Sequence, residues 1–309
     1  MFDVVGKRYL YFLISLIIIV PGLVSLIAFG IRPGIDFVGG TLLQVSTERA
    51  ATTTAVQQIL NNNGFGEAVV QLSGDKQNLV AIRTKPMDNT QKSKVEQDLV
   101  GQFGAVRELD YSTVGPVIGA ELRQKAFILV GVASALILLY IAWAFRNVSH
   151  PFRYGVCALV ALLHDVLVVT GIFSILGWLF NIEVDSLFVT AMLTVIGFSV
   201  HDTIVVFDRI RENLARRTGE PFENVVNASI VQTLARSLNT SVTVLLTLLA
   251  LYLFGGTTTR TFVLALLIGI FSGTYSSIFN ASCLLVVWQN GELGRFFGGR
   301  RRTATVAGA

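Results

Sequence analysis

Residues 187–207 read LFVTAMLTVIGFSVHDTIVVF, an apolar segment that contains a histidine and an aspartate near its end. Its uncharged part, Leu187–Ser199, has 13 residues and forms only about 20 Å of helix. A hydrocarbon core is about 30 Å thick, so the helix has to continue through His201 and Asp202 to cross it. A carboxylate at that depth costs at least about 2.5 kcal/mol and indicates a functional site.

A second segment repeats this pattern. Residues 164–169 read HDVLVV and residues 201–206 read HDTIVV, so Asp165 also lies inside an apolar run. Two such carboxylates favour ion or proton movement over a soluble activity. The sequence contains no Walker, Gly-x-Ser-x-Gly or Cys-x-x-Cys motif, which are the marks of an ATPase, a hydrolase or a redox protein. We therefore predict a protein that is not an enzyme, needs no cofactor and uses an ion gradient.

The composition predicts a polytopic α-helical membrane protein. Of 309 residues, 52% are hydrophobic and 14% are charged, whereas soluble domains carry about 25% charged residues. The net charge of +4 lies largely beside apolar runs, which indicates membrane topology and no binding of nucleic acid. The six predicted transmembrane helices cover residues 9–29, 126–145, 156–178, 187–207, 233–254 and 261–288.

Positive residues mark one side of these segments. Lys7 and Arg8 precede the first segment, and four arginines follow the fourth. The positive-inside rule places both termini in the cytoplasm, and the first segment is expected to be an uncleaved signal anchor. The predicted parts are residues 1–29 with the first helix, an extracytoplasmic domain at 30–125, a five-helix domain at 126–288 with a cytoplasmic loop at 208–232, and a cytoplasmic basic tail at 289–309.

Residues 30–125 predict a small ferredoxin-like α+β domain. The hydrophobic periods follow the order strand, helix, strand, strand, helix, strand, with glycines between them. This order is the split βαβ plan. The expected strands cover residues 41–46, 68–72, 79–84 and 106–112, and the expected helices cover residues 50–62 and 89–103.

Two further patterns favour structural interpretations. Residues 220–240 carry apolar side chains at helical spacing after Pro221, and the favoured interpretation is a short helix at the membrane surface. The sixth segment contains Gly269-x-x-x-Gly273, a pattern that lets two helices approach closely.

Asp202 and Arg236 form a candidate ionic pair. Their helices are consecutive and antiparallel in the predicted topology, so both side chains fall in the inner leaflet. Pairing with arginine favours the charged carboxylate, whereas burial without arginine favours the protonated form. A site that alternates between these conditions binds and releases a proton. Asp165, His164 and His201 adjoin the site, and each hexapeptide is expected to supply one inward group because neighbouring helical residues face different directions.

Other chemistries stay open at this point. The Asp202–Arg236 pair could serve only to fix helix packing. Two histidines and two aspartates could bind a metal, but no ligand cluster accompanies them, and Cys157 and Cys283 have neither metal nor disulfide spacing. Two intramembrane aspartates could form a protease dyad, but the Gly-x-Gly-Asp element of such proteases is absent before Asp202. No metal site is therefore predicted.

Three motifs resemble signatures of the SecD/SecF family. Residues 34–40 read GIDFVGG, residues 114–119 read VGPVIG, and residues 200–213 read VHDTIVVFDRIREN. The third motif is long and specific, whereas both halves of the family share the glycine motif. The resemblance covers nearly the whole chain, including the order and spacing of its six spans.

The resemblance implies an accessory subunit of the Sec preprotein translocase in the bacterial cytoplasmic (inner) membrane, related to the resistance-nodulation-division transporters. Its implied partners are SecD, the SecYEG channel, a translocating preprotein and membrane lipid, and its implied energy source is the proton gradient. It also implies a proton relay that includes Asp202, Arg236 and Asp165, beside His201. The implied hinge motif comprises Gly34, Asp36, Gly39 and Gly40.

Two alternatives remain at this level. One is a half-size proton-coupled transporter of the same superfamily that moves a lipid or a drug, and the other is a scaffold without transport. A drug pump of this superfamily usually has two large outer domains and twice as many spans, so a single small domain fits a half that needs a partner. The coupling ion, H⁺ or Na⁺, stays open.

The predicted topology can be tested with reporter fusions. Alkaline phosphatase fused after Gly74 should be active, because that position lies outside the cytoplasm, and a fusion after Gly219 should be inactive. The opposite pattern would overturn the topology and the inner-leaflet position of Asp202.

Overall fold

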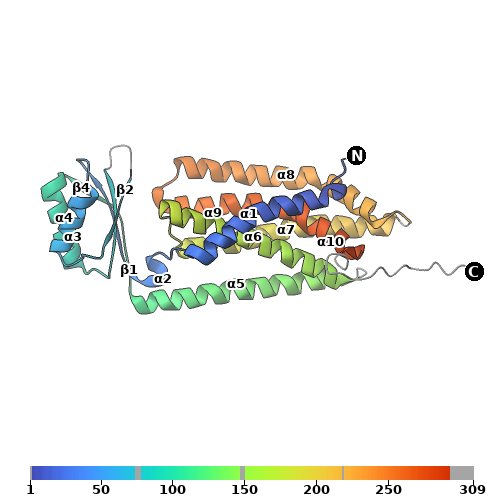
Figure 1. Ribbon diagram of the computed structural model, residues 1–309, viewed down its shortest axis with the longest axis horizontal. Coiled ribbons are helices and arrows are strands. Elements are labelled where there is room, and N and C mark those ends of the chain that lie inside the picture. The colour runs from blue at the N-terminus through green and yellow to red at the C-terminus, as the bar shows by residue number, and fades with distance from the viewer. Residues whose placement is uncertain (1, 74–77, 147–149, 218, 293–309) are drawn as a thin grey trace, which may run out of the picture. The chain divides into compact units, whose positions relative to one another are not determined.

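The computed structural model describes residues 2–73, 78–146, 150–217 and 219–292. The chain forms two compact units. The membrane unit comprises Met1–Arg32, Val130–Ile182 and Leu187–Ala309, and the sheet unit comprises Pro33–Leu129 and Glu183–Ser186. The elements of both units are labelled in Figure 1.

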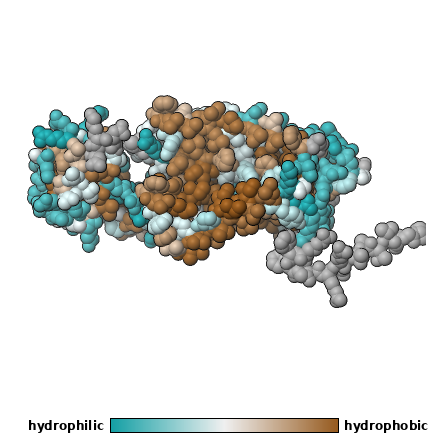
Figure 2. Space-filling model, turned by 45° about the horizontal axis from the view of Figure 1, so that its top comes forward, coloured by the Kyte–Doolittle hydropathy of each residue, from teal (hydrophilic) through white to brown (hydrophobic). Residues whose placement is uncertain are grey.

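The described residues contain six helices that are long and apolar enough to cross a membrane, which confirms the predicted number. Apolar side chains are exposed along these helices, and Figure 2 shows them covering much of the surface of the membrane unit. The helices are α1 (Arg8–Phe29), α5 (Pro116–Ala144), α6 (Pro151–Phe180), α7 (Ser186–Arg216), α8 (Phe222–Phe254) and a sixth span made of α9 (Arg260–Tyr275), a π-helix (Ser276–Ala281) and α10 (Ser282–Gln289).

The predicted surface helix at residues 220–240 is wrong. These residues begin α8, which continues without a break to Phe254. Val225, Val226 and Ile230 are fully buried, and Asn213 of α7 donates to the Ser229 hydroxyl at 2.8 Å. The apolar period of this stretch therefore marks a face that packs inside the protein, not a face that lies on lipid.

The N-terminal end of the membrane unit is held by polar contacts. The Asn227 side chain accepts from the backbone N–H groups of Val4 and Val5, and the Arg8 guanidinium pairs with Glu292 at 2.6 Å. Burial alone would raise the pKa of Glu292, but hydrogen bonds from Tyr9 and Arg8 offset burial and lower the pKa. The ends of α1 and α10 are thereby joined through a charged carboxylate.

The sheet unit has the predicted ferredoxin-like fold. Its four antiparallel strands lie in the order β2-β3-β1-β4, and both helices cover one face (Figure 1). This spatial order follows from the split βαβ connection. The elements are β1 (Gly40–Thr47), α3 (Thr53–Asn62), β2 (Val69–Ser73), β3 (Leu79–Thr84), α4 (Asn89–Phe103) and β4 (Val106–Val114).

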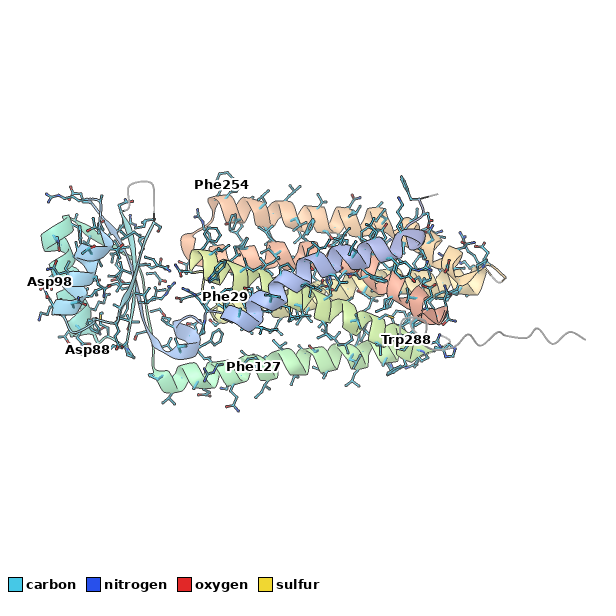
Figure 3. All side chains as sticks on the ribbon, viewed as in Figure 1. Phe29, Asp88, Asp98, Phe127, Phe254 and Trp288 are labelled. Carbon is cyan, nitrogen blue, oxygen red and sulfur yellow. The ribbon has the colours of Figure 1, made fainter. Side chains whose placement is uncertain are left out.

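Alternation along β1 builds the core of this unit. Leu43 and Val45 are fully buried, as is Ile82 on β3, because successive strand residues face opposite sides of the sheet. Asp88 starts α4 with a capping box, in which Gln91 and Asp88 satisfy each other's backbone N–H groups. Figure 3 labels Asp88 at the N-terminal end of α4.

The glycine motif forms a short helix, α2 (Ile35–Val38), followed by two glycines with positive φ, +79° at Gly39 and +133° at Gly40. A Cβ on Gly39 would lie 2.8 Å from the Pro116 Cα, and a Cβ on Gly40 would lie 2.7 Å from the Thr84 carbonyl oxygen. Gly119 approaches equally closely, because its Cβ would lie 2.8 Å from the Gly39 nitrogen. The first two motifs of the sequence therefore pack directly against each other.

Small residues also bring the membrane helices together. A Cβ on Gly22 of α1 would lie 2.9 Å from the Gly171 Cα of α6. A Cβ on Gly273 of α9 would lie 3.0 Å from the Ser199 Cβ of α7, and one on Gly269 would collide with Val195. These contacts confirm the close helix approach predicted from Gly269-x-x-x-Gly273.

The packing of the glycine motif can be tested with Gly39→Ala against Gly64→Ala. Both glycines have a similar φ, +79° and +83°, but a Cβ on Gly64 meets no atom within 4 Å. Backbone strain alone should cost about 1 kcal/mol at Gly64, and the collision with Pro116 should add about 1–3 kcal/mol at Gly39. We expect a clearly lower thermal midpoint for Gly39→Ala in detergent, and equal midpoints would contradict the close approach.

Candidate functional site

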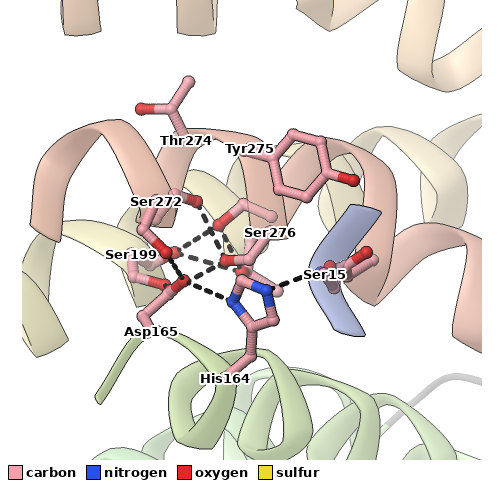
Figure 4. A network of polar contacts seen from close by, with 12 residues as sticks. Ser15, His164, Asp165, Ser199, Ser272, Thr274, Tyr275 and Ser276 are labelled. Carbon is pink, nitrogen blue, oxygen red and sulfur yellow. Dashed lines mark hydrogen bonds and ion pairs between the residues drawn. The ribbon is translucent and has the colours of Figure 1, made fainter. Parts of the chain in front are cut away.

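Asp165 is a buried carboxyl group whose two oxygens both have hydrogen-bond partners. It is 1% exposed and lies at the centre of the polar cluster in Figure 4. Ser199 of α7 and Ser276 of the π-helix donate to its Oδ2 at 2.5 and 2.7 Å. Ser272 of α9 donates to its Oδ1 at 2.8 Å, and His164 Nδ1 lies 3.0 Å from the same oxygen.

This shell has the chemistry of a site for a charged carboxylate. An ionised carboxylate only accepts hydrogen bonds and has about four sites for them. The three serine hydroxyls and the imidazole fill all four. Such bonds offset the large cost of removing a charge from water. Asp165 thus joins three helices through one carboxyl group.

The three serines were not predicted as site residues. A serine in an apolar helix gives no signal about which neighbour it will meet. A usable signal was the spacing of Ser272 and Ser276, which lie four residues apart and share one helical face. In the structure that face lies against Asp165 of the third span.

The π-helix Ser276–Ala281 sets the direction of several of these side chains. Such wide turns are rare and occur often at functional sites. Ser276 faces Asp165, while Ser277 donates to the Ser199 carbonyl at 2.8 Å and accepts from Thr203 at 2.8 Å. The extra width of the turn lets consecutive serines both reach polar partners on other helices.

His164 connects Asp165 to the first span. Its Nε2 lies 3.0 Å from the Ser15 hydroxyl of α1, and Asn280 donates to the same hydroxyl at 2.8 Å. His164 is 8% exposed. The expectation of one inward group per hexapeptide is therefore wrong for residues 164–169, where both polar residues are buried and bond each other.

Asp202 is also buried, at 2% exposed, but its environment differs. Its Oδ2 has no hydrogen-bond partner among the described residues. The hydroxyls of Ser241 and Thr274 lie beside the carboxyl group and bond each other at 2.6 Å. His201 is exposed, so the second hexapeptide supplies one inward group, as expected.

The predicted pair between Asp202 and Arg236 is absent from the described structure. Arg236 is exposed on α8, whereas the neighbouring Ser237 and Ser241 belong to the buried face. Successive helical residues point about 100° apart, so the rotation of α8 that brings Ser241 beside Asp202 turns Arg236 away from it. The prediction used depth in the membrane alone and did not include the rotation of α8.

The hinge motif lies in the sheet unit. Asp36 Oδ2 accepts from the backbone N–H of Ser186, the first residue of α7, at 2.8 Å. Gly34 donates to the Val184 carbonyl at 2.7 Å. Within the ranges that the structure describes, no three His, Cys, Asp or Glu residues lie close enough together to hold a metal ion.

Comparisons with known proteins agree on one family. Residues 94–291 match the model "Protein export membrane protein SecD/SecF, C-terminal", and residues 24–51 match the model of the SecD/SecF GG motif. A protein translocase subunit SecF from Thermobaculum terrenum is 55% identical over the full length of both chains. A protein translocase subunit SecDF from Bacillus subtilis is 34% identical over 94% of this chain and 38% of its own length.

A solved structure is also similar. The crystal structure of SecDF from Thermus thermophilus, described as a translocon-associated membrane protein, is 36% identical. Its TM-score is 0.83 over 94% of this chain and 39% of that chain. The similarity includes the six apolar helices and the antiparallel sheet described above.

The donor shell of Asp165 can be tested by removing one hydroxyl. Ser199→Ala leaves the buried carboxylate with three donors, and we expect a loss of about 1–3 kcal/mol in unfolding free energy. Ser134→Ala is the control, because the Ser134 hydroxyl only donates to the Val130 carbonyl of its own helix; its effect should stay within about 0.5 kcal/mol. Equal losses in denaturant titrations would show that Ser199 does not support the anion.

Proposed function

The chain belongs to the SecD/SecF family of protein-export membrane proteins, and we propose that proton movement through its membrane unit drives that export. It is a multi-pass membrane protein and a translocase subunit. We infer that it acts as an accessory to the SecYEG channel and not as an enzyme, and that a translocating preprotein is its substrate.

The observation that carries the proposal is the state of Asp202. A buried carboxyl oxygen without a partner is costly when charged, so this environment suits the protonated acid. Arg236, which would stabilise the charged form, lies off the buried face. Burial of Asp202 without the arginine is one of the two conditions between which a proton site must alternate. Rotation of α8 or approach of the arginine would supply the other condition.

Asp165 is the second member of the proposed relay. Its four donors hold a charge ready in the same bundle of helices as Asp202. The two sites share α7, since Ser199 bonds Asp165 and Asp202 lies three residues further along. They also share α9, through Ser272 and Thr274. A proton that leaves one carboxylate therefore has a short route to the other, and His201 lies next to that route.

A partner is needed to cover α8. Arg236 and four polar residues, Asn239, Thr240, Thr243 and Thr247, are exposed on this membrane-spanning helix. The three threonine hydroxyls turn back to carbonyls of their own helix. Polar and charged residues in a span face other protein segments or water and not lipid. SecDF relatives carry this chain's counterpart within a longer protein, so we propose that SecD covers this face.

The proposed orientation has both termini in the cytoplasm and the sheet unit outside it. The support is the arginine and lysine bias of the sequence. Proton flow inward through the membrane unit could then do work on a chain that emerges on the outer side. Membrane lipid would contact the remaining apolar surface of α1 and α5.

The proposal predicts that Asp202→Asn abolishes proton-dependent export while the protein stays folded and assembled. Asparagine keeps the volume and hydrogen-bonding groups but cannot carry a proton. Export of a secreted reporter into inverted membrane vesicles, with and without a proton gradient, measures the effect. Loss of assembly in place of loss of proton dependence would show that Asp202 is a packing residue.

Arg236 provides the companion variants. Arg236→Ala should abolish function, and Arg236→Lys should retain part of it at best, because lysine keeps the charge and loses the planar fork. The exchange Asp202→Arg with Arg236→Asp should not restore function, since a proton site depends on access as well as on charge. Full activity of the exchanged pair would place the proton route elsewhere, with Asp165 the next candidate.

A further inference from the structure

A continuous chain of hydrogen bonds runs from Asp165 to the sixth span by way of the first. Asp165 Oδ1 lies 3.0 Å from His164 Nδ1, His164 Nε2 lies 3.0 Å from Ser15 Oγ, and Asn280 Nδ2 lies 2.8 Å from the same Ser15 oxygen. The four side chains are all at least nine-tenths buried. Figure 4 shows the imidazole between Asp165 and Ser15.

Both ends of this chain assign the same direction to its hydrogen atoms. At one end, Asp165 already accepts from three serines, so its contact with the imidazole requires Nδ1–H as a fourth donor. At the other end, Asn280 donates to Ser15, which leaves the serine hydroxyl hydrogen free to donate to His164 Nε2. Neutral imidazole with the proton on Nδ1 satisfies both ends.

One atom of the chain is unsatisfied. Asn280 Oδ1 is buried and has no hydrogen-bond partner among the described residues. A buried acceptor without a partner costs about 1–3 kcal/mol, and such an atom in a native structure calls for an explanation. The oxygen belongs to the same amide whose Nδ2 lies 2.8 Å from the Ser15 oxygen, so a half-turn of that amide would bring Oδ1 to the serine hydroxyl.

We propose that His164 carries protons to Asp165, and that Ser15 and Asn280 reverse their hydrogen bonds to let it do so. This inference rests on the proposed function, because it assumes that protons move through the bundle. It assigns a role to His164, which that function does not require, and to the unsatisfied oxygen of Asn280.

The transfer has two proton steps. A hydronium ion from the gradient gives a proton to the Ser15 oxygen as the Ser15 hydrogen passes to His164 Nε2, and water leaves. The imidazolium then breaks its Nδ1–H bond as an O–H bond forms at Asp165 Oδ1, which yields neutral aspartic acid and the Nε2–H tautomer. Ser15 can no longer donate to Nε2, so its oxygen accepts from Nε2–H and its hydrogen turns to Asn280. The Asn280 amide turns by 180° so that its free Oδ1 receives this hydrogen, and Ser15 ends with one proton, as it began.

A cavity borders His164. It has a volume of about 640 Å³, lies between α1, α6, α8 and α9, and is lined by His164, Ser272 and Tyr275 among apolar side chains. The Tyr275 hydroxyl is engaged with the Tyr11 carbonyl at 2.8 Å. Hydrophobic constrictions gate by excluding water, so we expect hydration of this cavity to decide when His164 is protonated.

The groups that face His164 come from four elements. They are Asp165 on its own helix, Ser15 on α1, Tyr275 on α9 and Asn280 on the π-helix. The sequence contains three histidines, so its ring nitrogens can be resolved by ¹⁵N solid-state NMR once His150 and His201 are replaced. We expect neutral His164 to carry its proton on Nδ1. In the Asp165→Leu variant, His164 should lose its preference for the Nδ1–H tautomer. A neutral Nε2–H form with Asp165 ionised would overturn the proposal.

The transport test uses the complete complex in proteoliposomes, with proton flux measured per assembled complex. Ser15→Ala and Asn280→Leu should each slow proton flux about tenfold, the effect of one lost hydrogen bond. Ser15→Thr, which keeps the hydroxyl, should recover most of the flux. Ser25→Ala is the matched control, because Ser25 is a buried α1 serine that bonds Ser174 at 2.8 Å outside the chain of bonds; its flux should equal that of the wild type.

The outcomes separate this inference from the proposed function. If Asp165→Asn stops proton flux while Ser15→Ala and Asn280→Leu retain wild-type flux, the His164 route is wrong and the proton function stands. If Asp165→Asn and Asp202→Asn both retain flux, the proposed function fails and the inference fails with it. A reduced flux in Ser25→Ala equal to that in Ser15→Ala would show that any buried α1 serine matters only for packing.

Discussion

The membrane unit depends on one buried carboxyl group and the hydrogen bonds around it. Asp165 accepts from serines on α7, α9 and the π-helix and from the imidazole beside it, and through that imidazole it also reaches α1. Apolar contacts between spans carry little directional information, because lipid tails are as apolar as leucine. Hydrogen bonds to a charge are both stronger and directional. The rotation of three helices about their axes is therefore fixed at this point.

The second carboxylate owes its character to the first. Asp202 lies on α7, and the hydrogen bond from Ser199 of that helix to Asp165 on α6 sets the rotation of α7. Asp202 is consequently held inside the bundle while one of its oxygens is left without a partner among the described residues. The bundle thus holds two buried carboxyl groups in different environments, one with four donors around it and one with an oxygen that has no partner among the described residues. Acid–base relays elsewhere use pairs of groups in unlike environments.

Sequence patterns predicted the elements well and the contacts less well. The spans and the strand order followed from apolar runs and from periods of two and 3.6 residues, which reflect burial directly. β3 and α4 were predicted with their observed bounds. The Asp202–Arg236 pair is absent from the described structure, because depth in a membrane can be counted along the chain, whereas the rotation of α8 depends on which face other helices cover. Ser272 and Ser276 were missed for the same reason.

The π-helix at Ser276–Ala281 amounts to one residue more than a regular helix would place in that length. Everything that follows in α10 is therefore turned by about 100° relative to α9. This offset allows α9 to present Ser272 to the anion while Leu285 and Val286 of α10 still enter the apolar core. A single inserted residue can thus add a polar site to one half of a span without disturbing the packing of the other half, and its removal would return the span to an ordinary structural helix.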